Sequence, residues 1–290
     1  MFASPFARRA AFLGGFLGLT AALAAAQGAE GIPALASSEF GWQSNVADWQ
    51  APPEGTPGHG PIRMDPAHPF TSNAEANRLG IPPTLRIGDA KDPVLKPWAA
   101  KIMADSNEEA LSGKLDVPFA AQARCWPGGV PGQLLYPFEP VFFIQRKDEV
   151  VMMWQRDHMI RRVKLNAKHS ENPKPTWFGE SIGHYENGDT LVVDTIGLST
   201  KNSYIDNYRT PHTDKLHVVE RFTVSPDKKN LTAIVTVNDP DTFNEPLTMM
   251  QKWFKVNEPM DETVCAENNN DALFFNQKLP PMPEAKRPDF

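Results

Sequence analysis

The feature that most constrains the fold is an alternation of apolar and polar residues that begins after Tyr136. It recurs in short runs separated by connections of hairpin length. A period of two residues is typical of strands with one buried face. The runs are FEPVFFIQ, EVVMMWQ, MIRRVKL, TWFGESIGHYE, DTLVVDTIG, KLHVVERFTV, NLTAIVTVND, LTMMQKWFKV and ETVCAEN. The sequence therefore predicts eight or nine consecutive strands with no helix between them.

Short strands joined by hairpins predict an antiparallel meander. The strongest hairpin signal is Asn187-Gly188, because a type I′ turn needs positive φ at both central residues. A meander of this length usually closes into an up-and-down barrel, which removes exposed edges. Eight strands enclose a space for side chains or one small ligand. We expect a mainly β, closed antiparallel barrel with a mostly apolar cavity.

The first residues predict a secretory signal peptide over residues 1–26. Arg8 and Arg9 precede an apolar run too short to span a membrane, and small residues around Ala24–Ala26 offer a cleavage site. The arginine pair ahead of Phe12 raises twin-arginine export. We expect a soluble protein that is periplasmic or secreted.

Composition divides the remaining chain into three parts. Residues 27–120 are rich in proline, glycine and small polar residues, so they cannot form a core alone and are either disordered or wrapped around a core built later. Within them, residues 92–113 predict a short helical segment with Asp92 as N-cap and Leu95, Trp98, Ile102 and Met103 on one face. Residues 121–275 would form the barrel, and residues 276–290 a tail.

Two cysteines, Cys125 and Cys265, are the whole cysteine content. An even count in an oxidising compartment favours a disulfide, and two free buried thiols are the alternative. Neither belongs to a C-x-x-C pair, so a zinc site built on them is not expected.

The charge pattern limits the partners. The net charge is −6, with acidic and basic residues interspersed. Without a basic stripe or a lysine-rich amphipathic helix, we expect neither nucleic acid binding nor membrane insertion.

The densest polar cluster is YIDNYRTPHTDKLHVVERF, residues 204–222. A loop feeding a strand is a common place for a site, and histidine transfers protons near neutral pH. Alternation places Glu220 on one face of its strand, with His217 and Arg221 on the other. The candidate catalytic residues are Tyr204, Asp206, His212, His217, Glu220, Arg221 and, before the hairpin turn, His184.

Structural explanations compete for each candidate. The loop can simply cap the next strand, and His184 can be a surface residue. An inward Glu or Arg needs a partner to offset its desolvation, and Asp194 and Glu267 are available for it. His212 and His217 with Glu220 or Asp214 match no named metal motif, so no metal is expected.

Large, soft side chains are concentrated in the strands. Core packing is the simpler explanation, and a cavity for a flat apolar ligand is the other. The candidate ligand-binding residues are Met152, Trp154, Phe178, Met250 and Trp253.

Five motifs occur in a fixed order over residues 90–270: RCWPGGVP, PTWFGESIGHYENGDTLVVDTIGL, PHTDKLHVVERF, VNDPDTFNEP and VCAEN. Together they resemble a family of exported bacterial proteins that largely lack an assigned biochemical role. In that family the second motif runs G-x-S-x-G-x-W-E-G-D-T-L-V-V, whereas here Tyr185 replaces the tryptophan and Asn187 precedes Gly188. The resemblance implies a lipocalin-like barrel. Because the two cysteines fall in the first and last motifs, it also supports their pairing.

These observations favour cofactor-independent acid–base chemistry, of lyase, isomerase or hydrolase type, on a small hydrophobic compound such as an aromatic or terpenoid one. His212 or His217 would move the proton, Asp206 or Glu220 would orient a histidine, and Tyr204 and Arg221 would stabilise an oxyanion. The alternatives are a non-catalytic carrier of a hydrophobic molecule and an assembly protein whose proline-rich arm docks a partner. The sequence leaves homo-oligomer formation open.

Overall fold

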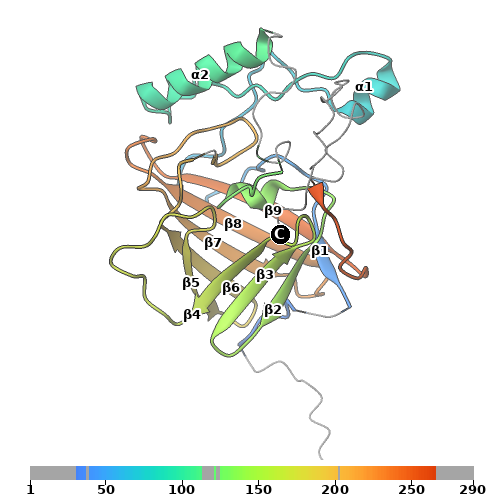
Figure 1. Cartoon of the computed structure of the whole chain (residues 1–290), viewed down its shortest axis with the longest axis vertical. Helices are drawn as coiled ribbons and strands as arrows, with labels where there is room; N and C mark the ends of the chain where they lie inside the picture. The colour runs from blue at the N-terminus through green and yellow to red at the C-terminus, as the bar shows by residue number, and fades with distance from the viewer. Residues whose placement is uncertain (1–30, 37–38, 113–120, 122–124, 202, 266–290) are drawn as a thin grey trace, which may run out of the picture.

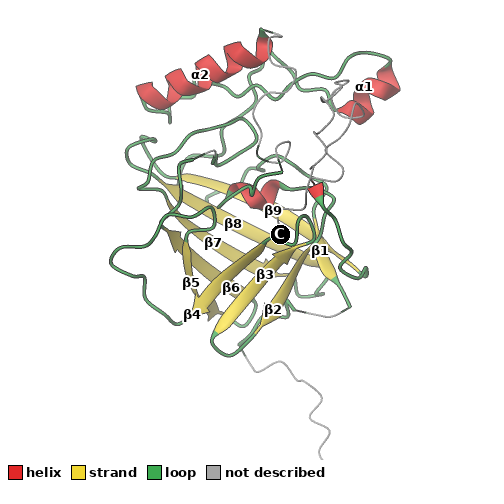
Figure 2. Cartoon of the chain, in the orientation of Figure 1, coloured by secondary structure: helices red, strands yellow, loops and turns green. Residues whose placement is uncertain are grey.

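Nine strands form one closed barrel in sequence order (Figures 1 and 2). The structure is a computed structural model that describes residues 31–36, 39–112, 121, 125–201 and 203–265, so the predicted signal peptide and C-terminal tail lie outside it. The mainly β barrel predicted from the sequence is confirmed. The strands are β1 (Gly41–Gln43), β2 (Val141–Gln145), β3 (Glu149–Trp154), β4 (Ile160–Leu165), β5 (Glu180–Glu186), β6 (Thr190–Ile196), β7 (His217–Val224), β8 (Asn230–Asn238) and β9 (Leu247–Val256).

One strand pair departs from the predicted antiparallel pattern. β4 and β5 run parallel, with Val163 opposite Ser181 and Leu165 opposite Gly183. Residues 166–179 connect them. A connection of this length can bring the chain back to the end of the barrel where β4 begins, so that β5 runs in the same direction as β4. No residue pattern in this connection distinguishes a crossover from a hairpin.

The strand that closes the barrel comes from the proline-rich arm. In β1, Trp42 lies opposite Val141 of β2 on one side and Lys255 of β9 on the other. The last predicted strand, residues 262–268, forms no strand over its described part, residues 262–265, and contributes only a bridge between Thr263 and Arg156. The ninth strand was therefore assigned to the wrong end of the chain.

The predicted hairpin at Asn187-Gly188 is present between β5 and β6. Both residues have positive φ, 53° and 77°, as a type I′ turn requires. The turn fixes the register of the pair, in which Ser181 and Gly183 face inward while Glu180, Ile182 and His184 face outward.

Side chains fill the interior of the barrel. Alternate residues of the strands point inward, and the buried apolar ones, each at most 5% exposed, pack in one continuous cluster. The rings of Phe143, Phe222 and Trp253 meet near its middle, with centroids 6.2 Å apart in both pairs. The apolar inward residues include Trp42, Val141, Val150, Met152, Trp154, Val163, Leu191, Val193, Val218, Leu231, Val235, Val237 and Met249. The hollow interior expected from the sequence is occupied by these residues.

The proline-rich arm wraps the barrel where it is described. Gln50 exchanges two backbone hydrogen bonds with Met250 on β9, both 3.0 Å long. Trp49 is buried, and its indole N–H donates to the carbonyl oxygen of Ile205. Of the two alternatives for this segment, wrapping therefore holds for these residues.

Two helices lie beyond one end of the barrel (Figure 1), α1 (Asn73–Leu79) and α2 (Pro97–Leu111). α2 is the predicted helical segment, but it starts at Pro97 behind N-cap Lys96, because Asp92 closes a turn with Val94 instead. Its buried face is Ala99, Met103, Asn107 and Ala110. Trp98 and Ile102, which the spacing placed on one face with Met103, are 40% and 46% exposed, whereas Met103 is buried.

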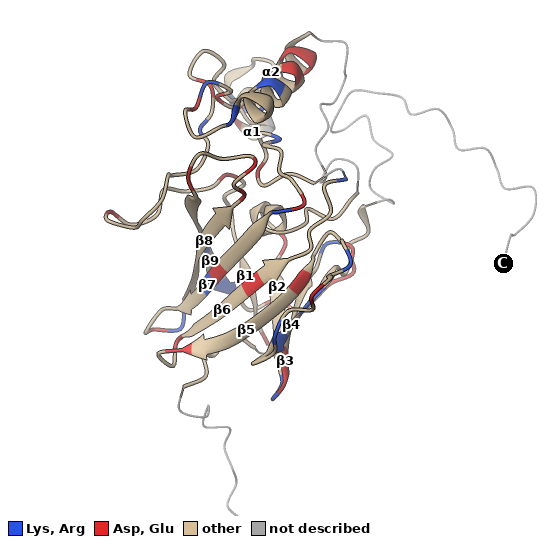
Figure 3. Cartoon of the chain, turned by 90° about the vertical axis from the view of Figure 1, so that its left-hand side faces the viewer, with Lys and Arg blue, Asp and Glu red and all other residues tan. Residues whose placement is uncertain are grey.

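The predicted disulfide joins Cys125 to Cys265, with Cα atoms 5.4 Å apart across 140 residues of sequence. A bond of this kind is typical of proteins in an oxidising compartment. Among the described residues, no helix has the length and apolarity to cross a membrane. Positive and negative residues are mixed along the visible strands and loops (Figure 3).

Candidate functional site

A group of histidines and carboxylates lies on the outer surface of the barrel. Asp194 faces outward from β6, opposite Ile182 of β5 and Val219 of β7. Glu180 and His217 are the first residues of β5 and β7. His169 belongs to the crossover between β4 and β5. We call His169, Glu180, Asp194 and His217 the rim cluster, because they surround the end of the barrel where β5 and β7 begin.

One carboxylate oxygen connects the two histidines. Oδ1 of Asp194 lies 2.8 Å from Nε2 of His169 and 2.9 Å from Nε2 of His217. Nδ1 of His169 lies 3.2 Å from Oε1 of Glu180. The result is a continuous chain of four titratable groups.

One end of this chain is the firmly held carboxylate of Glu180. The backbone N–H of Ser170 donates to Glu180 over 2.6 Å, and the Ser170 hydroxyl donates over 3.0 Å. The Ser170 backbone bond is the main reason why the pKa of Glu180 is lowered. Both nitrogens of His169 thus face carboxylate oxygens, and a protonated ring would donate to both.

The other end of this chain, His217, is accessible to solvent. The His217 side chain is 39% exposed and Asp194 36% exposed, whereas His169 is 19% exposed. His217 forms its hydrogen bond through Nε2, which leaves Nδ1 without a partner among the described residues. A ring oriented by a carboxylate on one nitrogen can accept a proton on the other.

The rim cluster is not arranged as a metal centre. Within the described ranges, no group of three or more His, Cys, Asp or Glu side chains could hold a metal ion. In the rim cluster, Nε2 of His169 and Nε2 of His217 both point at Oδ1 of Asp194. The hydrogen-bonded chain of histidines and carboxylates is itself an arrangement suited to proton transfer.

Known proteins give no further guide. No family model, curated protein or solved structure matches this chain. The resemblance drawn from the five motifs stays an expectation.

The two charged residues in the middle of β7 separate, as alternation predicted. Glu220 is fully buried inside the barrel and forms an ion pair with Arg161 of β4. Arg161 also donates to Ser181 over 3.0 Å and to Thr195 over 2.7 Å. The inward acid thus has a structural partner, but it is Arg161 and not Asp194; Glu267 lies outside the described residues.

Arg221 faces outward and pairs with Glu186, whose other carboxylate oxygen lies 2.9 Å from Nε2 of His184. His184 is therefore a surface residue beside the hairpin turn, bonded to Glu186 and not to the rim cluster. Whether either residue acts on a substrate stays a prediction.

His212 is buried ahead of β7. Its Nδ1 donates to the carbonyl oxygen of Thr213 over 2.8 Å, and its buried Nε2 has no hydrogen-bond partner. Burial lowers the pKa of His212. It forms no hydrogen bond with His217, so the two candidate bases are in different environments.

Asp206 organises its own loop. Oδ1 accepts from the backbone N–H groups of Tyr208 and Thr210, and Oδ2 accepts from the Thr210 hydroxyl over 2.6 Å. Burial raises the pKa of Asp206, although these hydrogen bonds act to lower it. Tyr204, two residues earlier, is half-buried, and burial raises its pKa as well. Neither residue contacts a histidine of the rim cluster through a hydrogen bond given by the structure.

The predicted ligand-binding residues occupy two places. Met152, Trp154 and Trp253 belong to the packed interior, and Phe178 stacks on Trp154 with ring centroids 5.8 Å apart. Met250 lies under the wrapping arm beside Gln50. A ligand among the inward residues would have to displace them, and their ligand role stays a prediction.

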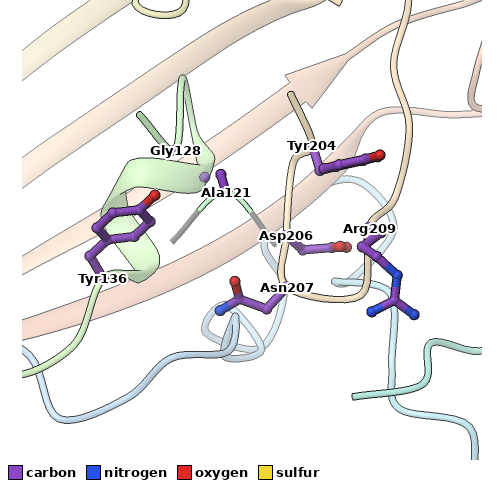
Figure 4. Close-up of a pocket in the computed structure, with 8 residues that line it drawn as sticks. Ala121, Gly128, Tyr136, Tyr204, Asp206, Asn207 and Arg209 are labelled. Atoms are coloured by element: carbon purple, nitrogen blue, oxygen red, sulfur yellow. The ribbon is translucent and has the colours of Figure 1, made fainter. Parts of the chain in front are cut away.

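A small depression lies between the segment of residues 128–136 and the loop of residues 204–209 (Figure 4). Its enclosed volume is only about 20 Å³. Glycines allow this close approach: a Cβ on Gly132 would lie 2.8 Å from the carbonyl oxygen of Tyr204, and one on Gly129 3.0 Å from Oγ of Ser203. The lining is Ala121, Gly128, Gly132, Tyr136, Tyr204, Asp206, Asn207 and Arg209.

Sequence reasoning missed residues that complete the rim cluster and the buried ion pair of Glu220. His169 lies in a crossover without alternation, Glu180 was not among the candidates, and Asp194 was named only as a possible partner of an inward Glu or Arg. The available signal was their outward position at strand ends next to His217. Arg161 could have been found because it shares the inward face of β4 with Val163.

Proposed function

We propose that this protein is an exported enzyme that moves protons on a small hydrophobic compound, with the rim cluster as its acid–base machinery. The observation that carries the proposal is the single Asp194 oxygen shared by two histidine Nε2 atoms at a partly exposed site. His217 would act as the base through Nδ1. Asp194 would orient its ring and stabilise the imidazolium that forms.

His169 completes the hydrogen-bonded chain behind His217. Its ring nitrogens face Glu180 and Asp194, so it would hold in place the carboxylate that orients His217. The proton that Nδ1 of His217 takes from one substrate atom can return from the same nitrogen to another substrate atom, so no second donor is needed. This arrangement suits reactions that remove a proton at one atom and return it at another, as lyases and isomerases do.

Apolar surface around the cluster supports a hydrophobic substrate. Ile182 and Val219 flank Asp194 across the sheet, and Ile196 follows two residues along β6; all three are partly exposed. A compound lying on these side chains would place a reacting atom beside His217. Export is supported by the predicted signal peptide and by the disulfide.

The test begins with untargeted mass spectrometry of compounds that co-purify with the full-length protein. The compounds found are then incubated with wild type, His217→Gln and Asp194→Asn. Because general acid–base groups contribute about 10²- to 10⁴-fold, we expect both variants to lower kcat/KM by that order. His68→Gln is the matched control: it changes a histidine of similar exposure that bonds a different carboxylate, Asp65, and should leave turnover unchanged.

Two outcomes would refute the proposal. Equal turnover by wild type and His217→Gln would leave the carrier function as the better account. Loss of wild-type turnover after treatment with a chelator would replace acid–base chemistry with metal-dependent chemistry.

A further inference from the structure

A group of apolar side chains lies on the outer surface of the barrel, across the neighbouring strands β2, β3 and β4 (Figure 1). Met153 of β3 lies directly opposite Ile160 of β4, and Val151 of β3 lies opposite Ile144 of β2. All four occupy outward positions, which alternate with the inward residues of the core. We call Ile144, Val151, Met153 and Ile160 the outer patch.

The outer patch is open to solvent. Ile144 and Ile160 are 46% and 54% exposed, and Val151 and Met153 are partly exposed. Neighbours on one face of a sheet lie about 5 Å apart across strands, so the four side chains form one continuous surface. Single exposed apolar residues need no explanation, but a continuous apolar patch marks an interaction site.

Phe138 adds an aromatic ring to the apolar surface near the start of β2, which it precedes by three residues. At 66% exposure it is the most exposed large apolar side chain in the described part of the chain. Its φ is 69°, a conformation that bulky residues rarely adopt. A strained backbone that holds an aromatic ring in solvent is costly, and a partner that covers the ring would account for it.

The C-terminal segment of the chain begins at the same end of the barrel. Thr263 forms a bridge with Arg156, in the connection between β3 and β4. The guanidinium of Arg156 donates to Sγ of Cys265 over 2.9 Å and to the carboxylate of Glu139, next to Phe138, over 3.0 Å. Cys265 therefore lies where β3 ends and β4 begins, and the disulfide with Cys125 fixes its position.

The residues after Cys265 include a short apolar run. Leu273, Phe274 and Phe275 follow it by eight to ten positions and are flanked by polar residues. Eight extended residues span at most about 26 Å. A strand of six residues is about 20 Å long. The run can therefore reach every part of the outer patch from Cys265.

We propose that the outer patch is the docking surface for residues 272–275 of the same chain, with the ring of Phe138 as part of the contact. A second copy of the protein is a poorer occupant, because a stable complex buries about 800 Å² on each partner, far more than a few side chains provide. A tethered segment needs less surface, since a short linker holds it at an effective concentration in the millimolar range. The proposal is independent of the rim cluster, because docking is measured without turnover.

The first experiment places the photoreactive residue p-benzoylphenylalanine at position 275 of the full-length protein and locates its crosslinks by mass spectrometry. We expect crosslinks within one molecule, to Phe138 or to residues of β2, β3 and β4. Ile144→Asp should lower their yield about three- to tenfold, because a buried isoleucine contributes about 1.5–3 kcal/mol. Ile102→Asp is the matched control: Ile102 of α2 is also 46% exposed, and its replacement should leave the yield unchanged.

Three results of this experiment would overturn the proposal. They are no crosslink to these strands or Phe138, crosslinks mainly between two molecules, and an equal loss of yield in Ile144→Asp and Ile102→Asp.

The second experiment leaves the barrel unchanged, in case Ile144→Asp does not fold. Phe274→Ser combined with Phe275→Ser removes the two aromatic rings from the segment after Cys265. The methyl NMR signals of Ile144 and Ile160 should then shift, whereas the signal of Ile102 should not. Phe290→Ser, which removes an aromatic ring 15 positions after Phe275, is the matched control and should leave all three signals unchanged. Unchanged signals of Ile144 and Ile160 in the double variant, or equal shifts in Phe290→Ser, would refute the docking.

Discussion

Removing either member of the Arg161–Glu220 pair should destabilise the barrel strongly. The two side chains are 2% and 0% exposed, and the guanidinium connects four strands: β4, which carries it, and β5, β6 and β7 through Ser181, Thr195 and Glu220. Glu220→Leu leaves a charged guanidinium in an apolar interior, and Arg161→Met leaves a charged carboxylate there. Breaking a buried ion pair in this way costs about 3–5 kcal/mol.

The double variant separates two explanations of that loss. Arg161→Met combined with Glu220→Leu leaves no buried charge, and such replacements are often neutral. We therefore expect the double variant to recover most of the stability that either single variant loses. The coupling between the two sites should be large, because the side chains are in direct contact.

Urea unfolding of the four proteins, followed by far-UV circular dichroism, measures these differences. For a domain of this size, each kcal/mol corresponds to a shift of about 2–4 °C in Tm, so either single variant should melt roughly 6–20 °C lower. Single-variant losses below about 1 kcal/mol would refute the reasoning, since they would mean that water reaches the pair. Additive losses in the double variant would also refute it.

Two other predictions concern stability. Cys125→Ser with Cys265→Ser should lower the free energy of unfolding by about 4–5 kcal/mol in the chain-entropy model, because the bond spans 140 residues; unchanged urea midpoints would contradict this. His212 is buried with its pKa lowered, so the unfolded chain binds its proton first as the pH falls below about 6.5, and stability should decrease from there toward the lower folded pKa. His212→Gln should flatten this part of a Tm-against-pH curve, whereas an unchanged slope would exclude His212 as its source.

Local patterns predicted most of the barrel. Alternation located β2 to β9, and the Asn187-Gly188 pair located the β5–β6 turn, because both signals depend on neighbouring residues. β1 has only three residues inside a proline-rich segment, and its pairing with β2 and β9 depends on the whole barrel. The parallel β4–β5 pair was missed for a similar reason, since the length of a connection does not reveal its direction.

The same distinction applies to the candidate sites. Sequence alternation correctly separated Glu220 from His217, which directed attention to the outer surface for His217. It could not bring in His169, which approaches Asp194 from a crossover loop 25 residues earlier. Nor could it show that Arg209 bonds only neutral acceptors among the described residues, because that depends on how separate segments pack around it.

The position of β1 has a consequence for how the chain acquires its shape. Trp42 is made early in synthesis, yet its strand partners, Val141 and Lys255, follow much later. Contacts between such distant residues form slowly, because a long loop must be ordered first. The barrel is thus closed by an early segment whose partner strand β9 is synthesised more than 200 residues later. Until then β2 and β9 present open edges, to which a strand of another molecule could add.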